Sequence, residues 1–158
     1  MSTHFSQILA EFGLRIGIPD LSMDTLGHCA LQFDEVQLNL LWLQEERNVL
    51  CYAPLAIIHP DTHCELIWEL MAANNFYLGT RGATLSWDDV SHQCHISQLL
   101  DSERMTINAF EQAVQQLVNT AEHWSRRIGQ SSQAVETDKS SASISASAFP
   151  AGIFGQMA

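Results

Sequence analysis

The spacing of hydrophobic residues along the chain predicts an alternation of helices and strands. Over 3–16 and 107–128 the apolar positions recur with the helical period and share one face. Short apolar runs bounded by polar turns predict strands over 27–33, 36–43, 49–55, 83–87 and 93–100. With one further helix over 61–74, the order α-β-β-β-α-β-β-α and the short connections predict an α+β fold, in which an antiparallel sheet packs against helices.

A proline interrupts the third predicted strand. Pro54 has no N–H to donate to a strand ladder, and prolines in sheets are largely confined to edges and bulges. We therefore expect this strand either to lie at an edge of the sheet or to end at Pro54.

The helix predicted over 61–74 has no single apolar stripe. The residues expected to face the sheet are Leu66, Leu70 and Ala73. Ile67, Trp68 and Met71 point well away from them, and burying these three would stabilise by about 5–9 kcal/mol as an upper estimate. A second copy of this helix across a two-fold axis would cover them, so we predict a homodimer. The alternative is that the final helix or the tail covers them within one chain.

The predicted strands also carry apolar residues on both faces. In 36–43, Leu41 and Leu43 lie on the face opposite to Leu38 and Leu40. An antiparallel sheet with one face in water should instead alternate cleanly between apolar and polar residues. We therefore expect a helix, or a segment of another protein, to cover the second face.

Composition changes at Gly129. Residues 129–147 are mostly Ser, Ala, Gln and Gly, and such a segment buries too little apolar surface to offset its ordering entropy. We therefore predict one folded domain over 1–128 and a disordered Ser/Ala-rich tail over 129–158. Hydrophobic side chains return near the end, which suits either a short docking peptide or merely a nonpolar terminus; they are Phe149, Ile153, Phe154 and Met157.

The charge of the chain excludes several classes of partner. It has 7 Lys and Arg against 18 Asp and Glu, a net charge of −11. Nucleic acids and anionic membranes are bound by clustered cations, so we expect neither as a partner. The start of the chain lacks the basic and apolar regions of a signal peptide, and its widely spaced cysteines suit reduced thiols, so we expect a cytoplasmic protein.

Histidine and cysteine residues are the candidate metal ligands. His92, Cys94 and His95 lie close together, with His59, His63 and Cys64 upstream, and zinc accepts such ligands. On a strand, however, Cys94 and His95 point to opposite faces, so this set cannot chelate one ion without a bulge. We predict no metal site.

Paired carboxylates are the remaining candidates for chemistry. Glu65 and Glu69 lie one helical turn apart, which would allow acid–base work. This polar strip more simply stays in water or meets an arginine such as Arg81. The chain has no motif for phosphate binding, dinucleotide binding or an activated serine. We therefore predict no enzyme, no catalytic residue and no cofactor.

Two longer stretches carry a family pattern, "LMAANNFYLGTRGATLSWDD" over 70–89 and "FEQAVQQLVNTAEHW" over 110–124. They resemble the class I type III secretion chaperones, the Tir-chaperone-like family. In that family, a Leu-rich helix ends in Ala-Asn before a Gly-containing turn, and the final helix carries Ala-Glu before a Trp. The order of elements agrees over 3–128. Trp87, where the family more often has an aliphatic residue, and the tail depart from the pattern.

The resemblance implies a function. Such proteins are acidic cytoplasmic homodimers that bind the N-terminal segment of a secreted effector, keep it extended and deliver it to the secretion apparatus, whose ATPase is a further expected partner. The implied dimer interface contains Ile67, Trp68, Met71 and Leu85. The implied effector-binding residues are Leu14, Ile16, Leu31, Phe33, Leu41 and Leu43.

Two other functions stay open from the sequence. A dimeric adaptor unrelated to secretion would share the interface but would not need the effector-binding grooves. A zinc-dependent enzyme would need the histidine and cysteine set, and stoichiometric zinc in the purified protein would favour it.

Overall fold

The computed structural model describes residues 3–58 and 64–145, with side chains over 4–58 and 65–131. The elements are α1 (Thr3–Ile16), β1 (His28–Phe33), β2 (Val36–Leu43), β3 (Asn48–Ile57), α2 (Cys64–Asn74), the 3-10 turn η1 (Asn75–Tyr77), β4 (Thr84–Trp87), β5 (Gln93–Asp101) and α3 (Ile107–Ser145). The predicted order and the α+β class are confirmed, and the predicted start of the second helix at 61 or 62 lies outside the described residues.

The five strands form one antiparallel sheet in the order β1-β2-β3-β5-β4. The expectation that Pro54 puts its strand at an edge or ends it is wrong, because β3 is central and runs on to Ile57. The sheet tolerates the proline because the register with β2 stops at the pair of Asn39 and Tyr52, before Pro54 is reached. The ladder with β5 also shifts register between Pro54 and Ile57, as a bulge would.

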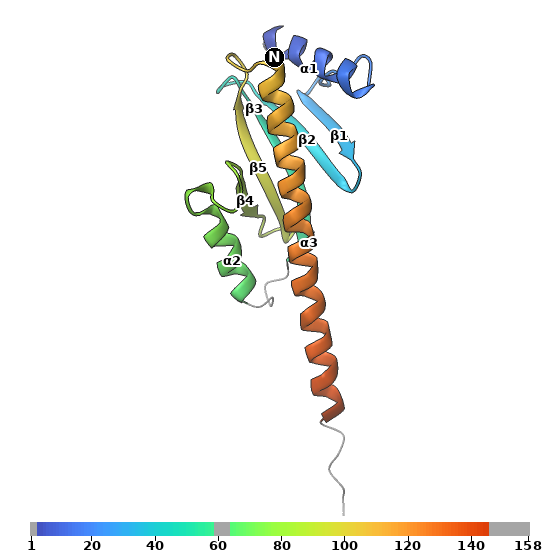
Figure 1. The fold of residues 1–158 in the computed structure, drawn as a ribbon, viewed down its shortest axis with the longest axis vertical. Helices are drawn as coiled ribbons and strands as arrows, with labels where there is room; N and C mark the ends of the chain where they lie inside the picture. Colours follow the sequence, from blue (N-terminus) through green and yellow to red (C-terminus); the bar gives the residue numbers. More distant parts are fainter. Residues whose placement is uncertain (1–2, 59–63, 146–158) are drawn as a thin grey trace, which may run out of the picture.

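The helices lie on one face of the sheet. Figure 1 shows α3 running across the strands, with α1 crossing near its start. The rings of Phe5 and Phe12 meet Phe110 edge to face, with centroids 5.4 and 5.1 Å apart, and join α1 to α3. Under the helices, alternate residues of each strand are buried, including Leu38, Leu40, Val49, Cys51 and Ile96. The apolar stripes predicted for the first and last helices therefore build the core.

The last helix is longer than the periodicity predicted. We expected it to end at Ile128 and the chain beyond to be disordered, but the backbone stays helical to Ser145. Ile128 is the last buried apolar residue of α3 among the described side chains. A helix already nucleated by packing extends through Ser, Ala and Gln at little cost, which explains the continuation. The division of the chain into a domain and a tail at residue 128 stays a prediction, and 146–158 lie outside the described residues.

Polar contacts fasten α2 to α3 and β4. Arg127 on α3 donates two hydrogen bonds, of 2.8 and 2.6 Å, to the carboxylate of Glu69 on α2. The partner of Glu69 is thus Arg127, not the Arg81 that we suggested, because the side chain of Arg127 reaches α2 from α3, while Arg81 lies in the turn after η1. The amide side chain of Asn74 exchanges hydrogen bonds of 2.8 and 3.0 Å with the backbone of Leu85. These contacts hold α2 with one face outward.

Candidate protein-binding surfaces

Half of the large exposed hydrophobic residues that the structure describes come from one segment, from α2 to β4. We call this set the α2 surface; it comprises Ile67, Trp68, Met71, Phe76, Tyr77, Leu78 and Trp87. Trp68 is 66% exposed and Met71 59%, whereas Leu66, Leu70 and Ala73 on the other side of α2 are buried against the sheet. The predicted split of the helix into an inner and an outer apolar face is confirmed, and the role of the outer face in a dimer stays a prediction.

Leu85 does not belong to the α2 surface, although we assigned it to the dimer interface. Its side chain is only 6% exposed and lies in the core of the protomer. The reason is its register in the sheet: Leu85 pairs with Ile96 of β5, which is also buried, and the pleat points both toward the helices.

The sequence patterns did not single out the turn after α2. Phe76 is 85% exposed, Leu78 nearly as much, and Phe76 and Tyr77 have positive φ angles of 50° and 59°. Gly79 explains this shape, because a Cβ at Gly79 would lie 2.7 Å from the Cβ of Ala73. The turn therefore closes tightly on the end of α2 and directs its side chains outward. Three consecutive large apolar residues before that glycine were the available signal.

The sheet face turned away from α1 and α3 also carries apolar residues. Leu41 pairs with Leu50, and Leu50 pairs with Leu99, so the three form a row across β2, β3 and β5. Leu99 is 54% exposed and the other two are half-buried, and within the described residues no helix covers them. We call this row, with Leu43 beside it, the open sheet face. Our sequence patterns found Leu41 and Leu43 but missed Leu50 and Leu99, which the same alternation could have identified.

The six predicted effector-binding residues do not form one surface. Leu41 and Leu43 lie on the open sheet face. Leu14 and Ile16 are exposed at the end of α1, on the side of the sheet that carries the helices. Leu31 is 5% exposed and cannot meet a partner, because it pairs with buried Leu38 and points into the core. Phe33 is half-buried and packs against the same core.

The sheet has two free edges in the described chain, β1 and β4. The outer side of β1 offers six residues, His28–Phe33, with no neighbouring strand. Free strand edges present unpaired N–H and C=O groups, which an extended peptide can pair with. β1 also adjoins the open sheet face, since His28 pairs with Leu41.

The residues considered for metal chemistry are not brought together. Cys94 is buried, which raises its pKa to about 11, while His95 lies on the opposite face and meets the ring of Tyr52. His59 and His63 lie outside the described residues, and within the described part of the chain no three His, Cys, Asp or Glu side chains are grouped to hold a metal. No described helix is both long and apolar enough to cross a membrane.

Comparison with known proteins identifies the fold. Residues 7–125 match the Tir chaperone protein (CesT) family. The chain belongs to this family. Over 129 residues it is 31% identical to the transcriptional anti-antiactivator ExsC of Pseudomonas aeruginosa. This aligned region covers 81% of this chain and 88% of ExsC.

Solved structures of secretion chaperones share the architecture. A chain of the ExsC–ExsE complex has a TM-score of 0.68 at 27% identity, covering 80% of this chain and 96% of that one. A chain of the HopA1–SchA chaperone–effector complex has a TM-score of 0.66 at 20% identity, covering 78% and 94%. The resemblance to class I type III secretion chaperones is thus confirmed, and the protein is a binding protein of this class, not an enzyme.

Proposed function

We propose that this chaperone holds the N-terminal segment of a secreted effector in an extended form, along the free edge of β1 and over the open sheet face. The observation that carries the proposal is the row of Leu41, Leu50 and Leu99, an apolar strip that no helix of the described chain covers. A strand added beside β1 would continue the sheet, and every second side chain of that strand would lie on the same face as this strip, with β1 between them.

Binding in this form suits a segment that is unfolded beforehand. A strand pairs with β1 through its backbone, so the sequence requirement falls mainly on the residues that continue from this strand over the apolar strip. A folded effector would first have to open, and the cost of opening would lower its affinity. The bound segment is therefore extended and kept from aggregating, which is the state that secretion requires.

We further propose that the protein acts as a homodimer through the α2 surface. Ile67, Trp68 and Met71 point outward from a helix that Glu69 and Asn74 hold in place, and a two-fold axis would bury each copy against the other. Two copies of the cargo site would raise the effective concentration for one long segment. We expect this dimer to work in the cytoplasm and to present its cargo to the secretion-apparatus ATPase.

A secretion assay tests the cargo site. Deleting the gene should remove one or a few effectors from the culture medium, as measured by mass spectrometry. Wild-type protein supplied in trans should restore them, and the Leu99→Glu variant should not, because a carboxylate would lie in the apolar strip. Val90→Glu is the matched control: Val90 is 85% exposed in the β4–β5 turn, away from the strip. Full restoration by Leu99→Glu would contradict the proposed site.

A regulatory role is the second candidate function. It is favoured by the 31% identity to ExsC, a transcriptional anti-antiactivator, and by the 27% identity to a chain of the ExsC–ExsE complex. In that case the same surfaces would bind an antiactivator of transcription instead of, or in competition with, an effector. A reporter for secretion-gene transcription in the deletion strain separates the two. Reduced transcription would support the regulatory role. Normal transcription together with loss of effectors from the medium would support only the chaperone role.

A further inference from the structure

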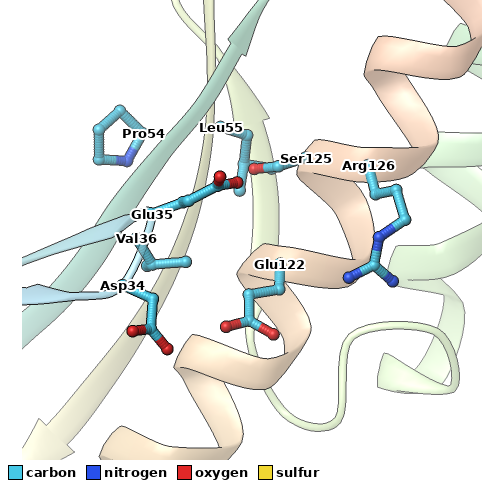
Figure 2. Close-up of a pocket in the computed structure, with 8 residues that line it drawn as sticks. All are labelled: Asp34, Glu35, Val36, Pro54, Leu55, Glu122, Ser125 and Arg126. Carbon is cyan, nitrogen blue, oxygen red and sulfur yellow. The ribbon is translucent and has the colours of Figure 1, made fainter.

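A cleft opens where β2 and β3 separate. Their register ends at Asn39 and Tyr52, and continuing it would place Gln37 opposite Pro54, which has no N–H to donate. The strands part there and leave a cleft of about 610 Å³ between the β1–β2 turn, β3 and α3 (Figure 2). Its lining residues are Asp34, Glu35, Val36, Pro54, Leu55, Glu122, Ser125 and Arg126.

The cleft has an apolar wall and an excess of negative charge. Val36, Pro54 and Leu55 supply the apolar part, and three carboxylates and one guanidinium also line the cleft. In Figure 2 the carboxylate of Glu122, on α3, is turned toward that of Asp34, in the β1–β2 turn. The cleft is thus bounded by negative groups from two separate elements.

The charges of the cleft form no ion pairs with other residues that the structure describes. By contrast, Arg15 and Arg127 lie outside the cleft and meet carboxylates at 2.6–2.8 Å. Within the described residues, none of the four charged side chains of the cleft takes part in an ion pair, although Glu122 and Arg126 are one helical turn apart. Asp34 and Glu122 are therefore available to an outside cation.

We propose that this cleft binds an arginine side chain of the partner segment, an inference that rests on the proposed cargo function. The methylene stem of the arginine would lie along Pro54 and Leu55, and its guanidinium would donate to Asp34 and Glu122. Arginine fits better than lysine, because its planar fork donates in two directions at once and is more weakly hydrated. The net charge of −11 favours the approach of a basic segment.

The position of the cleft predicts where that arginine lies in the cargo. β1 ends at Phe33, and Asp34 follows directly at the mouth of the cleft. A segment paired along His28–Phe33 would therefore carry its arginine just beyond the paired residues, while its apolar side chains lie on the side of the open sheet face. The partner is thus an extended segment with alternating apolar residues flanked by an arginine.

A titration of the full-length protein with N-acetyl-arginine amide tests the cleft directly. In heteronuclear NMR spectra, the backbone resonances of Asp34, Glu35 and Glu122 should shift saturably. N-acetyl-citrulline amide, which has the same shape without the charge, should bind at least about fivefold more weakly, the effect of losing one partly exposed charge pair. The Asp34→Asn/Glu122→Gln double variant should bind the arginine compound about tenfold more weakly than wild type.

A control with the same change in net charge completes the experiment. Glu45→Gln/Glu46→Gln removes two exposed carboxylates from the β2–β3 turn, and should bind the arginine compound as wild type does. Equal affinity for the arginine and citrulline compounds would overturn the proposal, and so would an unaffected cleft double variant, shifts confined to other residues or no binding. Because this probe needs neither β1 pairing nor the open sheet face, its outcome is independent of the Leu99→Glu secretion assay.

Discussion

Replacing Trp68 with glutamate should separate the proposed homodimer into protomers. Trp68 lies at the middle of the outer face of α2, with Ile67 and Met71 beside it, and is 66% exposed in the protomer. Because it contributes little to the core, the variant protomer should fold normally. In a two-fold interface each substitution acts twice, and it places a carboxylate from each copy in an apolar contact.

The magnitude follows from the exposed area. A tryptophan side chain presents about 250 Å² when fully exposed, so about 165 Å² of Trp68 is available for burial. If a partner covers half of this, the loss at about 25 cal/mol per Å² is about 2 kcal/mol per protomer, or about 4 kcal/mol per dimer. That corresponds to a dissociation constant about a thousandfold higher, before any charge repulsion is added.

Light scattering coupled to size-exclusion chromatography, repeated over a range of protein concentrations, measures this effect. Wild type should run as a dimer and Trp68→Glu as a monomer, with unchanged circular dichroism. Val90→Glu, the same kind of change at another exposed apolar residue, should stay dimeric. A Trp68→Glu variant that dimerises as tightly as wild type would refute the assignment of the α2 surface.

Other contacts give smaller predictions. Arg127→Met should barely change urea unfolding, because surface ion pairs contribute little. It should weaken the dimer, because α2 loses the two hydrogen bonds that Glu69 accepts from Arg127, and an unchanged dimer would contradict this. Trp124→Phe removes the 3.1 Å hydrogen bond to the carbonyl oxygen of Gly79 and should lower the free energy of unfolding, measured in urea, by about 1–2 kcal/mol. An unchanged free energy of unfolding would argue against this hydrogen bond. Burial raises the pKa of Cys51 from 9.0 to about 12, so iodoacetamide at pH 9 should modify this thiol only after unfolding. Since the thiol ionises at lower pH in the unfolded chain than in the folded one, its contribution to stability should fall between about pH 9 and about pH 12. A difference in free energy of unfolding between wild type and Cys51→Ala that does not change with pH would contradict this.

Local periodicity accounts for what the sequence predicted correctly. Phe5 and Leu9 on α1, and Phe110 and Ile128 on α3, are all fully buried, as their helical spacing indicated. The outward face of α2 was also readable, because residues three and four apart share a side of a helix wherever that helix lies. These inferences need only the geometry of one element.

Inferences that depended on neighbours were less successful. The expectation for Pro54 failed because strand order is not a local property: β5 inserts between β3 and β4 and places β3 at the centre. Leu31 and Leu85 were assigned to binding surfaces, yet each pairs with a buried residue of the adjacent strand and points into the core. A strand pattern identifies two faces, but not which face the helices will cover.

The sequence by itself determined the order of elements, the apolar stripes that build the core and an excess of hydrophobic surface, because each follows from the fixed repeat of a helix or a strand. The tertiary structure alone decided which residues carry that excess. Pairing across the sheet aligned Leu41, Leu50 and Leu99 in one row, and the missing N–H of Pro54 left a charged cleft beside α3. The leucine row and the cleft each bring together residues that are far apart in the chain. The distances between those residues are set by tertiary packing, which no local sequence pattern records.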